Sequence, residues 1–197
     1  MKIIRAANCR TSPWKNGGGS TTEIAVGPID ASLDNFDWRV SMARVASDGP
    51  FSEFPGIDRT LAIINGNGLA LTIGHRTAFT IDRGSAPANF PGDVPTSARL
   101  IAGEILDLNV MSRRGRFSHR LRRVRKPTFL DFGECDIAIA IACEGTAVLK
   151  SQNQSVALDR GDAVILGHAS DEPVELAPTA LSNCYLVELR EHSDQPG

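Results

Sequence analysis

The sequence has no long apolar segment and no strong charge bias, and each absence excludes a class of protein. The longest uninterrupted apolar run, Ile137 to Cys143, is far too short to span a bilayer. The first residues, Met1 to Arg5, lack the apolar stretch of a secretion signal. A formal net charge of −2 gives no general attraction to nucleic acid or to an anionic membrane. We therefore expect a cytoplasmic protein whose partner is neither a membrane nor a nucleic acid.

Residue types that bind metals or attack substrates are few and scattered. No His-x-His pair occurs that would turn two imidazoles to one face of a strand, and no cysteines have C-x-x-C spacing. Neither a G-x-S-x-G elbow nor a phosphate-binding G-x-x-x-x-G-K-[ST] loop is present. We expect reduced thiols, no metal and no cofactor, and only His168, which follows an apolar segment, leaves a functional role open. The scattered residues are His75, His119, His168, His192, Cys9, Cys135, Cys143 and Cys184.

Helical periodicity is also nearly absent. The 18 glycines and 11 prolines separate short apolar segments that alternate at period 2, which is the pattern of β-strands. We expect at most a turn or two of helix near Asp30 to Asn35, and otherwise an all-β barrel or sandwich. The predicted strands are Thr21 to Val26, Trp38 to Val45, Thr60 to Ile64, Leu69 to Ile73, Arg76 to Ile81, Ile105 to Met111, Ile137 to Ala142, Ala147 to Ser151, Ser155 to Leu158, Ala163 to Leu166 and Cys184 to Leu189.

A weak internal repeat indicates that the chain holds two similar units. Gly66 to Gly84 and Gly145 to Gly161 each run from a glycine through two short strands to an Asp-Arg-Gly turn. This resembles the small-barrel unit of cupins, so we expect a bicupin, an all-β double barrel of the jelly-roll type. No flexible linker separates the halves. The predicted domains are residues 1–115 and 116–197, packed as one body.

The residues best suited to a binding site lie in the first sixty positions. Trp14, Lys15 and Asn16 precede three glycines, which let a backbone turn sharply and approach a ligand closely. A tight turn into the next strand explains the glycines equally well, and the sequence leaves both uses open. Both tryptophans of the chain fall in this region, the second being Trp38.

Alternation along the strand that begins at Trp38 separates an apolar face from a polar one. Trp38, Val40 and Met42 share the first face, while Arg39 and Ser41 lie on the second with Ala43. An arginine among small residues suits a barrel interior that holds a small anion, because a guanidinium can bind a carboxylate with two hydrogen bonds. A solvent-facing Arg39 remains the alternative.

Two further pairs of polar residues are candidates for the same interior. Asp58 and Arg59 follow a Phe-Pro-Gly turn and point to opposite faces of a regular strand, so one would fix the loop while the other faces the site. Asp107 and Asn109 share one strand face, which could equally lie in solvent. The predicted ligand-binding residues are Trp14, Lys15, Asn16, Arg39, Ser41, Phe51, Asp58, Arg59, Asp107 and Asn109.

The segment from Arg113 to Lys126 is densely basic in an otherwise slightly acidic chain. It has a single aromatic residue, Phe117, and so lacks the interleaved rings of a base-stacking surface. We read it as a solvated connection between the two units. Its alternative use is to bind an acidic partner or a nucleic acid.

The motifs of the first 115 residues resemble those of the HutD/Ves family, which are small bicupin proteins. The matching strings are Pro13 to Gly19 with Thr22 to Ile24, Trp38 to Ser41, Gly49 to Ser52, Phe54 to Gly56 with Asp58 and Arg59, Phe90 to Asp93, and Asp107 to Asn109 with Met111. The resemblance implies a bicupin fold and a link to bacterial histidine utilisation, in which HutD proteins are thought to tune the pathway. It implies urocanate or a formylated glutamate as the suspected ligand.

The leading hypothesis from the sequence is a non-catalytic, ligand-binding regulatory protein. Arg39 would pair with a ligand carboxylate, Lys15 and Asn16 would close over it, and Trp14 or Phe51 would form an apolar wall. The alternative is a metal-independent cupin isomerase or hydrolase acting on a small acid. Its acid or base would be Glu23, Asp58 or Glu104. The sequence leaves homodimer formation open.

Overall fold

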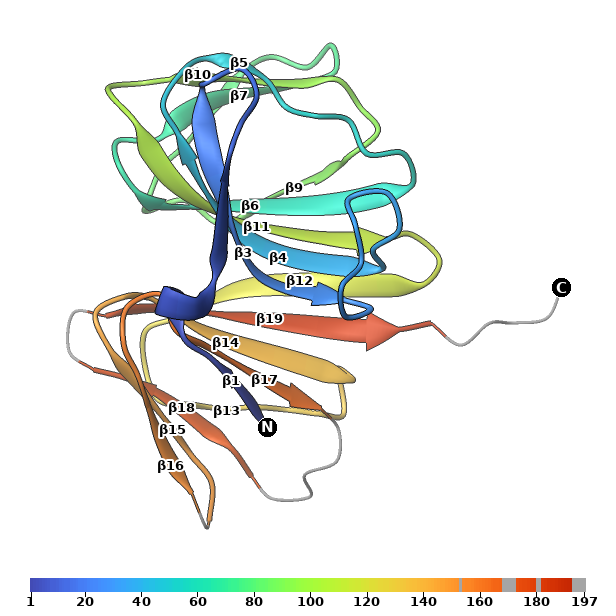
Figure 1. Cartoon of the computed structure of the whole chain (residues 1–197). Coiled ribbons are helices and arrows are strands. Elements are labelled where there is room, and N and C mark those ends of the chain that lie inside the picture. The colour runs from blue at the N-terminus through green and yellow to red at the C-terminus, as the bar shows by residue number, and fades with distance from the viewer. Residues whose placement is uncertain (153, 168–172, 180–181, 193–197) are drawn as a thin grey trace, which may run out of the picture. The chain divides into compact units, whose positions relative to one another are not determined.

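The computed structural model describes residues 1–152, 154–167, 173–179 and 182–192, and nearly all of its regular structure is β-strand. The chain forms two compact units, one of residues 10–118 and one of residues 1–9 with 119–197. Figure 1 shows each unit as layered sheets. The predicted all-β, cupin-like double barrel is confirmed, as the solved structures compared below also show.

The unit of residues 10–118 packs a six-stranded sheet on a four-stranded one. In hydrogen-bonding order the first contains β2 (Arg10–Pro13), β3 (Gly19–Gly27), β4 (Trp38–Val45), β11 (Ile105–Arg113), β6 (Ile57–Asn65) and β9 (Ala88–Pro91). The second contains β5 (Gly49–Pro50), β10 (Thr96–Leu100), β7 (Leu69–Ile73) and β8 (Phe79–Ile81). Apolar side chains of the two sheets, including Val45, Leu61, Ile63, Leu71 and Phe90, form one core cluster.

The other unit repeats this plan with a five-stranded and a four-stranded sheet. The first contains β1 (Lys2–Ile4), β17 (Ala163–Gly167), β14 (Ile137–Glu144), β19 (Asn183–Glu191) and β12 (Phe117–Val124). The second contains β13 (Thr128–Phe129), β18 (Glu175–Pro178), β15 (Ala147–Lys150) and β16 (Ser155–Leu158). Ala138, Ala140 and Ala142 turn one face of β14 toward a core of leucines that includes Leu149 and Leu176.

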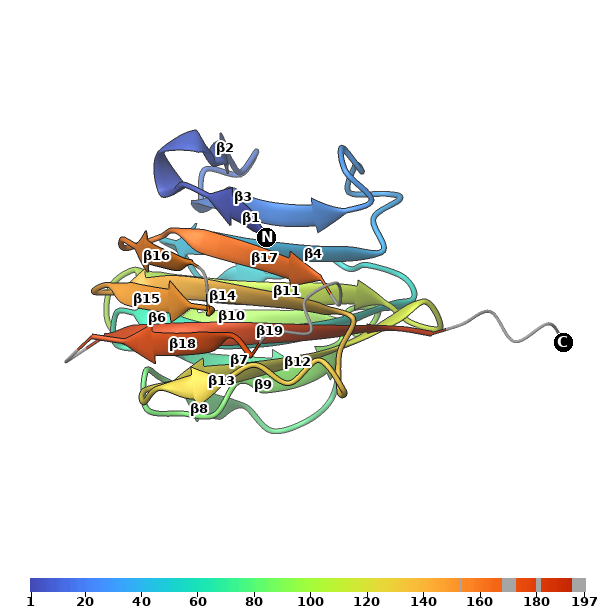
Figure 2. The ribbon, with the colours of Figure 1, turned by 90° about the horizontal axis from the view of Figure 1, so that it is seen from below.

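The structure divides the chain differently from the predicted boundary at residue 115. β1 pairs antiparallel with β17, with Ile3 opposite Val164, and Figure 2 shows the two strands side by side. Residues 1–9 therefore belong with the C-terminal unit, whereas the sequence analysis placed them in the first domain. The pairing joins segments about 160 residues apart, and no local pattern in the sequence encodes it.

Two local expectations are corrected by the structure. Residues 30–35 form turns, with Asp30 at a φ of 63°, and contain no helix; the short 3₁₀ helix described by the structure is η1 (Ala6–Asn8). The basic segment after Arg113 is largely the strand β12, and so it is more than a solvated connection. Phe117, Leu121 and Val124 are its buried apolar residues.

Candidate functional site

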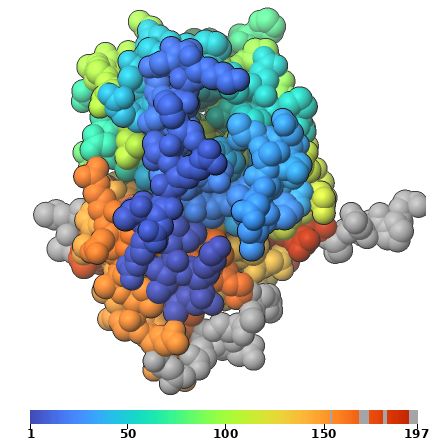
Figure 3. Space-filling view, in the orientation of Figure 1, coloured from blue at the N-terminus to red at the C-terminus, as the bar shows by residue number. Residues whose placement is uncertain are grey.

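A cavity of about 810 Å³ opens in the unit of residues 10–118. Strands β4, β6 and β11 form its floor, while β2, β3 and the segments around residues 31–33 and 50–54 form its walls. Figure 3 shows residues of β2 and β3 on the surface of this unit, on the face it views. The polar and charged lining residues are Arg10, Ser12, Lys15, Asn16, Thr21, Glu23, Ser32, Arg39, Ser41, Ser52, Arg59, Asp107 and Asn109.

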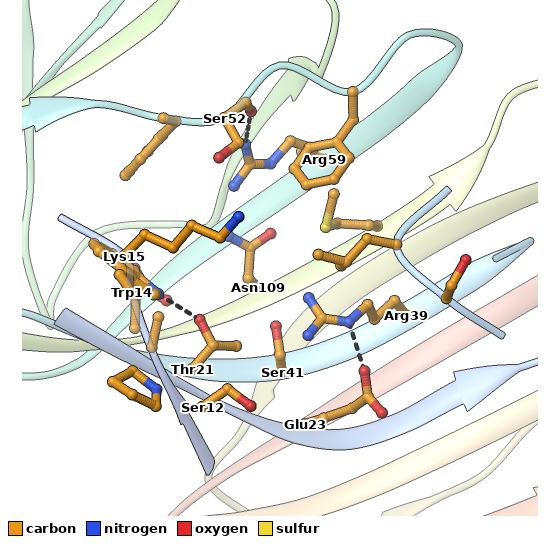
Figure 4. A pocket seen from close by; sticks show the side chains of 18 of the residues that line it. Ser12, Trp14, Lys15, Thr21, Glu23, Arg39, Ser41, Ser52, Arg59 and Asn109 are labelled. Atoms are coloured by element: carbon orange, nitrogen blue, oxygen red, sulfur yellow. Dashed lines mark hydrogen bonds and ion pairs between the residues drawn. The ribbon is translucent and has the colours of Figure 1, made fainter. Parts of the chain in front are cut away.

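The pairing register of the floor strands explains why two arginines face this cavity. Met111 of β11 lies opposite Arg39 of β4 on one side and opposite Arg59 of β6 on the other. Because neighbouring strands are about 4.8 Å apart, the two arginine backbones are separated by roughly 10 Å. Two residues along β11, Asn109 lies opposite Ser41. In Figure 4 the labelled side chains of these residues converge on the cavity.

Arg59 is the most deeply buried cation of the cavity, with 6% of its surface exposed. Its Nη1 donates a hydrogen bond of 3.1 Å to the carbonyl oxygen of Ser52, and its guanidinium carbon lies 5.2 Å from the ring centres of both Phe51 and Phe90. Its Nε has no hydrogen-bond partner among the described residues. Burial lowers the pKa of Arg59 to about 10, against the opposing attraction of Asp107.

Asp107 and Asn109 place two more unpartnered atoms in the same cavity. Asp107 is 1% exposed, and its Oδ1, like Oδ1 of Asn109, accepts no hydrogen bond from the described residues. Burial raises the pKa of Asp107 to about 7, although the charge of Arg59 and a hydrogen bond from the backbone of Ala43 both lower it. A buried polar atom without a partner is costly, and such atoms mark places where a ligand or a water is expected.

Arg39 is held from one side by an ion pair. Its Nε donates a hydrogen bond of 2.8 Å to Oε2 of Glu23, which β3 turns into the cavity close to a β-bulge. Because this contact uses Nε, the two terminal amino groups of Arg39 remain directed toward the cavity, as Figure 4 shows. The lining thus carries the cations Arg10, Lys15, Arg39 and Arg59 against the carboxyl groups of Glu23 and Asp107.

The glycine-rich turn supports the wall that Trp14 forms. Trp14 Nε1 donates a 2.8 Å hydrogen bond to Oγ1 of Thr21, and the side chain of Asn16 accepts one from the backbone N–H of Gly18. A Cβ at Gly19 would lie 3.0 Å from the Trp14 ring and would also meet the carbonyl oxygen of Arg44. The turn therefore needs a glycine here, and the three residues before the glycines, Trp14, Lys15 and Asn16, line the cavity.

Nine of the ten predicted site residues line the cavity, and Asp58 does not. Asp58 is adjacent to Arg59 on β6 and so points to the opposite face, where its carboxylate accepts a 2.8 Å hydrogen bond from Arg114. Asp58 is half exposed. Of the pair Asp58 and Arg59, it is therefore the residue that fixes the loop, while Arg59 faces the cavity. The place of Asp58 among the ligand-binding residues is corrected.

Several lining residues were missed by the site prediction. Arg10 and Thr21 were missed because they reach the cavity wall only when β2 pairs with β3. Leu33 was missed because its loop carries no recognisable motif. Met111 could have been found, because it shares the face of Asp107 and Asn109. Glu23 was considered only as a catalytic group of the alternative hypothesis.

Several arginines of the basic segment have partners within the chain. Arg114 pairs with Asp58 and Asp93, and Arg122 with Glu188 at 3.1 Å. Arg123 Nε donates a 2.8 Å hydrogen bond to the hydroxyl of Tyr185. Part of the charge of the segment is thus paired with carboxylates of the chain itself.

The described residues contain no cluster of three histidine, cysteine, aspartate or glutamate side chains that could hold a metal ion. His168 lies outside the described residues. The four cysteines are free thiols. No helix in the described part of the chain is long and apolar enough to cross a membrane.

The comparisons with known proteins identify the family. The HutD family model matches residues 6–183. The chain belongs to the HutD family. It is 37% identical over 121 residues to Protein Ves of Citrobacter koseri, covering 61% of each chain. It is 34% identical over 122 residues to an uncharacterised 21.2 kDa protein in the hutC 3′ region of Pseudomonas putida, covering 62% of this chain and 63% of that one. The matched part thus spans less than two thirds of these curated relatives.

Solved structures extend the match to nearly the whole chain. A conserved protein of unknown function from Pseudomonas aeruginosa superimposes with a TM-score of 0.86 at 28% identity, covering 96% of this chain and 98% of that one. HutD from Pseudomonas fluorescens gives 0.82 at 27% identity, covering 98% and 99%. Bacillus subtilis oxalate decarboxylase, at 9% identity and a TM-score of 0.63, covers 98% of this chain and 78% of its own and shares the fold alone.

Proposed function

We propose that this HutD-family chain is a non-catalytic regulatory protein whose cavity in residues 10–118 binds a small carboxylate. The ligand carboxylate lies against Arg59, within reach of the amino groups of Arg39. Asn109 and Ser41 complete the polar floor, and Trp14 and Phe51 form the apolar wall. A cavity of about 810 Å³ suits a metabolite-sized ligand.

The observation that carries this proposal is the unsatisfied guanidinium of Arg59. The side chain is almost fully buried, yet its Nε has no partner and no described carboxylate lies within 4 Å of its nitrogens. A buried cation without an ion-pair partner is costly unless an anion joins it. Three phenylalanine rings, Phe51, Phe54 and Phe90, surround the group and keep its face away from water. An entering carboxylate would supply the missing acceptor.

The charge of the remaining lining agrees with an anionic ligand. Arg10 and Lys15 add two cations from the wall, and Lys15 points into the cavity in Figure 4. Glu23 is already engaged with Arg39, so its charge is not free to repel a ligand carboxylate. A positively charged, partly enclosed site raises the local concentration of small anions.

The proposed role in histidine utilisation is supported by the family alone. One relative lies in the hutC 3′ region of Pseudomonas putida, and the Pseudomonas fluorescens structure bears the name HutD. Urocanate and formylglutamate, which the family resemblance suggested, are therefore the first pathway ligands to test. Simple carboxylates should bind more weakly at the same cation.

The test is calorimetric titration of the protein with urocanate, formylglutamate, formate and acetate. Replacing Arg59 by methionine should weaken binding by about 2–5 kcal/mol, because the ion pair forms away from water. Arg44→Met is the matched control, since Arg44 lies on β4 of the same sheet but pairs with Glu104 at the surface. Unchanged affinity in Arg59→Met would remove Arg59 from the site. Failure of all four carboxylates to bind would contradict the proposed function.

One observation favours an enzyme as the second candidate. Asp107 faces the cavity with a carboxyl pKa of about 7, which is the range in which a general acid or base works best. The candidate is a metal-independent isomerase or hydrolase of the same small acids, with Asp107 transferring the proton. Turnover of urocanate or formylglutamate by metal-stripped protein, lost in Asp107→Asn, would favour it over the binding protein.

A further inference from the structure

We propose that the cavity takes up its anion together with a proton, and that the carboxyl group of Asp107 holds this proton. The inference rests on the proposed function, because it concerns the same carboxylate site. Its consequence is that affinity for a carboxylate falls as the pH rises through neutrality. The site would then respond to pH as well as to ligand concentration.

The position of Asp107 excludes an ordinary hydrated carboxylate. It lies near the start of β11, between Ala43 of β4 and Ile63 of β6, and is 1% exposed. One oxygen, Oδ1, has no partner among the described residues, and the residue lines the cavity. This unpaired, buried oxygen is well placed to carry a proton and to donate it in a hydrogen bond.

The charges around Asp107 decide what an incoming anion does to it. Arg59, from the adjacent strand β6, favours the ionised form of Asp107. A ligand carboxylate bound to Arg59 neutralises that cation and adds a negative charge beside Asp107. Two carboxylates that share an enclosed site cannot both remain ionised at low cost, so one takes up a proton. The charged groups that line the cavity around Asp107 are Arg59 of β6, Arg39 of β4, Arg10 of β2, Lys15 after β2 and Glu23 of β3.

The protonated form also gains a contact that the ionised form lacks. A neutral carboxyl O–H can donate a short, strong hydrogen bond to a ligand carboxylate. Even with the cavity empty, burial raises the pKa of Asp107 to about 7, so little additional interaction is needed to keep the proton at neutral pH. The anion and the proton therefore stabilise each other in the site, which is the thermodynamic meaning of linked binding.

The experiment measures the dissociation constant of formate from pH 6 to pH 8, with acetate as a second probe. Both probes stay ionised over this range and carry no N–H group that could donate to Asp107. For wild-type protein we expect affinity about tenfold weaker at pH 8 than at pH 6, since the free carboxyl loses its proton near pH 7. Asp107→Asn should bind with an affinity independent of pH. Asp58→Asn is the matched control, because Asp58 lies outside the cavity, and should retain the wild-type dependence.

The outcomes separate this inference from the proposed function. Binding with equal affinity at pH 6 and pH 8 in wild-type protein would overturn proton uptake and leave the carboxylate site standing. No binding of formate or acetate at either pH would overturn this inference, and it would contradict the proposed function only together with a failure of urocanate and formylglutamate to bind. If Asp107→Asn fails to fold, the pH dependence of the formate dissociation constant in wild-type protein and in Asp58→Asn is the deciding measurement.

Discussion

At the scale of single residues, Asp107 gives the protein a pH-dependent stability that can be measured without a ligand. Its folded-state pKa of about 7 lies above the ordinary value of 3.8. Such a raised carboxyl stabilises the fold fully below pH 3.8, and this contribution is lost as the pH rises through 7. Between pH 5 and pH 8 the free energy of unfolding of wild-type protein should fall by a few kcal/mol relative to that of Asp107→Asn, at about 1.4 kcal/mol for each unit of pKa shift. Urea unfolding at the two pH values measures this difference. An equal change in the free energy of unfolding of the two proteins would contradict the raised pKa of Asp107.

Glu23 is a positioning residue for Arg39. The 2.8 Å hydrogen bond from Arg39 Nε to Glu23 fixes the guanidinium from one side and leaves its amino groups for a ligand. Glu23→Gln keeps the shape but removes the charge, so we expect formate to bind about two- to tenfold more weakly, a loss of roughly 0.5–1.5 kcal/mol. Glu104→Gln, which weakens an exposed pair with Arg44, is the control and should change nothing. Tighter binding by Glu23→Gln would show instead that Glu23 competes with the ligand for Arg39.

At the scale of elements, the turn between β2 and β3 builds the wall of the cavity. Gly19→Ala would drive a methyl group against the Trp14 ring and the backbone of Arg44. We expect destabilisation of about 1–3 kcal/mol in urea unfolding, together with weaker ligand binding, because a small-to-large change in a packed site forces its neighbours to move. Gly49→Ala is the control, since nothing lies within 4 Å of the added Cβ. Equal stability of the two variants would mean that the turn relaxes freely.

The sequence predicted those elements whose pattern is local. β4 was predicted with its observed bounds, and its alternation correctly placed Arg39, Ser41 and Ala43 on the cavity face. β11 was predicted for the same reason, with Asp107 and Asn109 on that face. The physical cause is that one face of each strand packs against apolar residues while the other faces the cavity, so apolar and polar residues alternate along the sequence.

Elements that depend on distant partners were not predictable in this way. The arginines of β12 obscured its strand pattern, because their partners, Glu188 for Arg122 and the hydroxyl of Tyr185 for Arg123, lie on the distant strand β19. β1 and β2 have no buried residues, so no alternation marks them as strands. The buried atoms of Arg59, Asp107 and Asn109 that lack a hydrogen-bond partner can be recognised only once the strands are placed in register. The polar residues of the site could be guessed, but its unsatisfied atoms could not.

At the scale of the whole molecule, the first nine residues are part of the C-terminal unit, and Asp162 holds them. It accepts hydrogen bonds of 2.9 Å from the backbone of Ala6 and 2.6 Å from Arg5. Burial alone would raise the pKa of Asp162, but these bonds and one from Asp159 lower it below its ordinary value. Its stabilising effect is therefore present above pH 3.8 and lost as the pH falls further.

Asp162→Asn should accordingly destabilise the protein at neutral pH by about 1–3 kcal/mol, because the amide cannot replace both charge-assisted contacts. The neighbouring, exposed Asp159→Asn serves as the control. Carboxylate binding at the cavity of residues 10–118 should be unaffected. Hydrogen exchange at the amides of β1 reports the effect directly, and unchanged protection there in Asp162→Asn would contradict the assigned role.

The two units use one fold for different ends. In residues 10–118 the floor strands carry Arg39, Arg59 and Asn109 facing a cavity, whereas in the other unit the alanines of β14 pack against leucines. The inward-facing positions are thus polar around the cavity of the first unit and apolar along β14 of the second. The proposed function therefore belongs to the first unit, with the second stabilised by its own core.

The most direct test of carboxylate binding at Arg59 is the nuclear magnetic resonance signal of its Nε–H group during titration with formate. We expect this signal to shift to saturation, because the unpartnered donor gains a carboxylate acceptor, and the shift should require higher formate concentrations at pH 8 than at pH 6. An Arg59 signal that stays unchanged while the protein binds formate elsewhere would contradict a carboxylate site at Arg59.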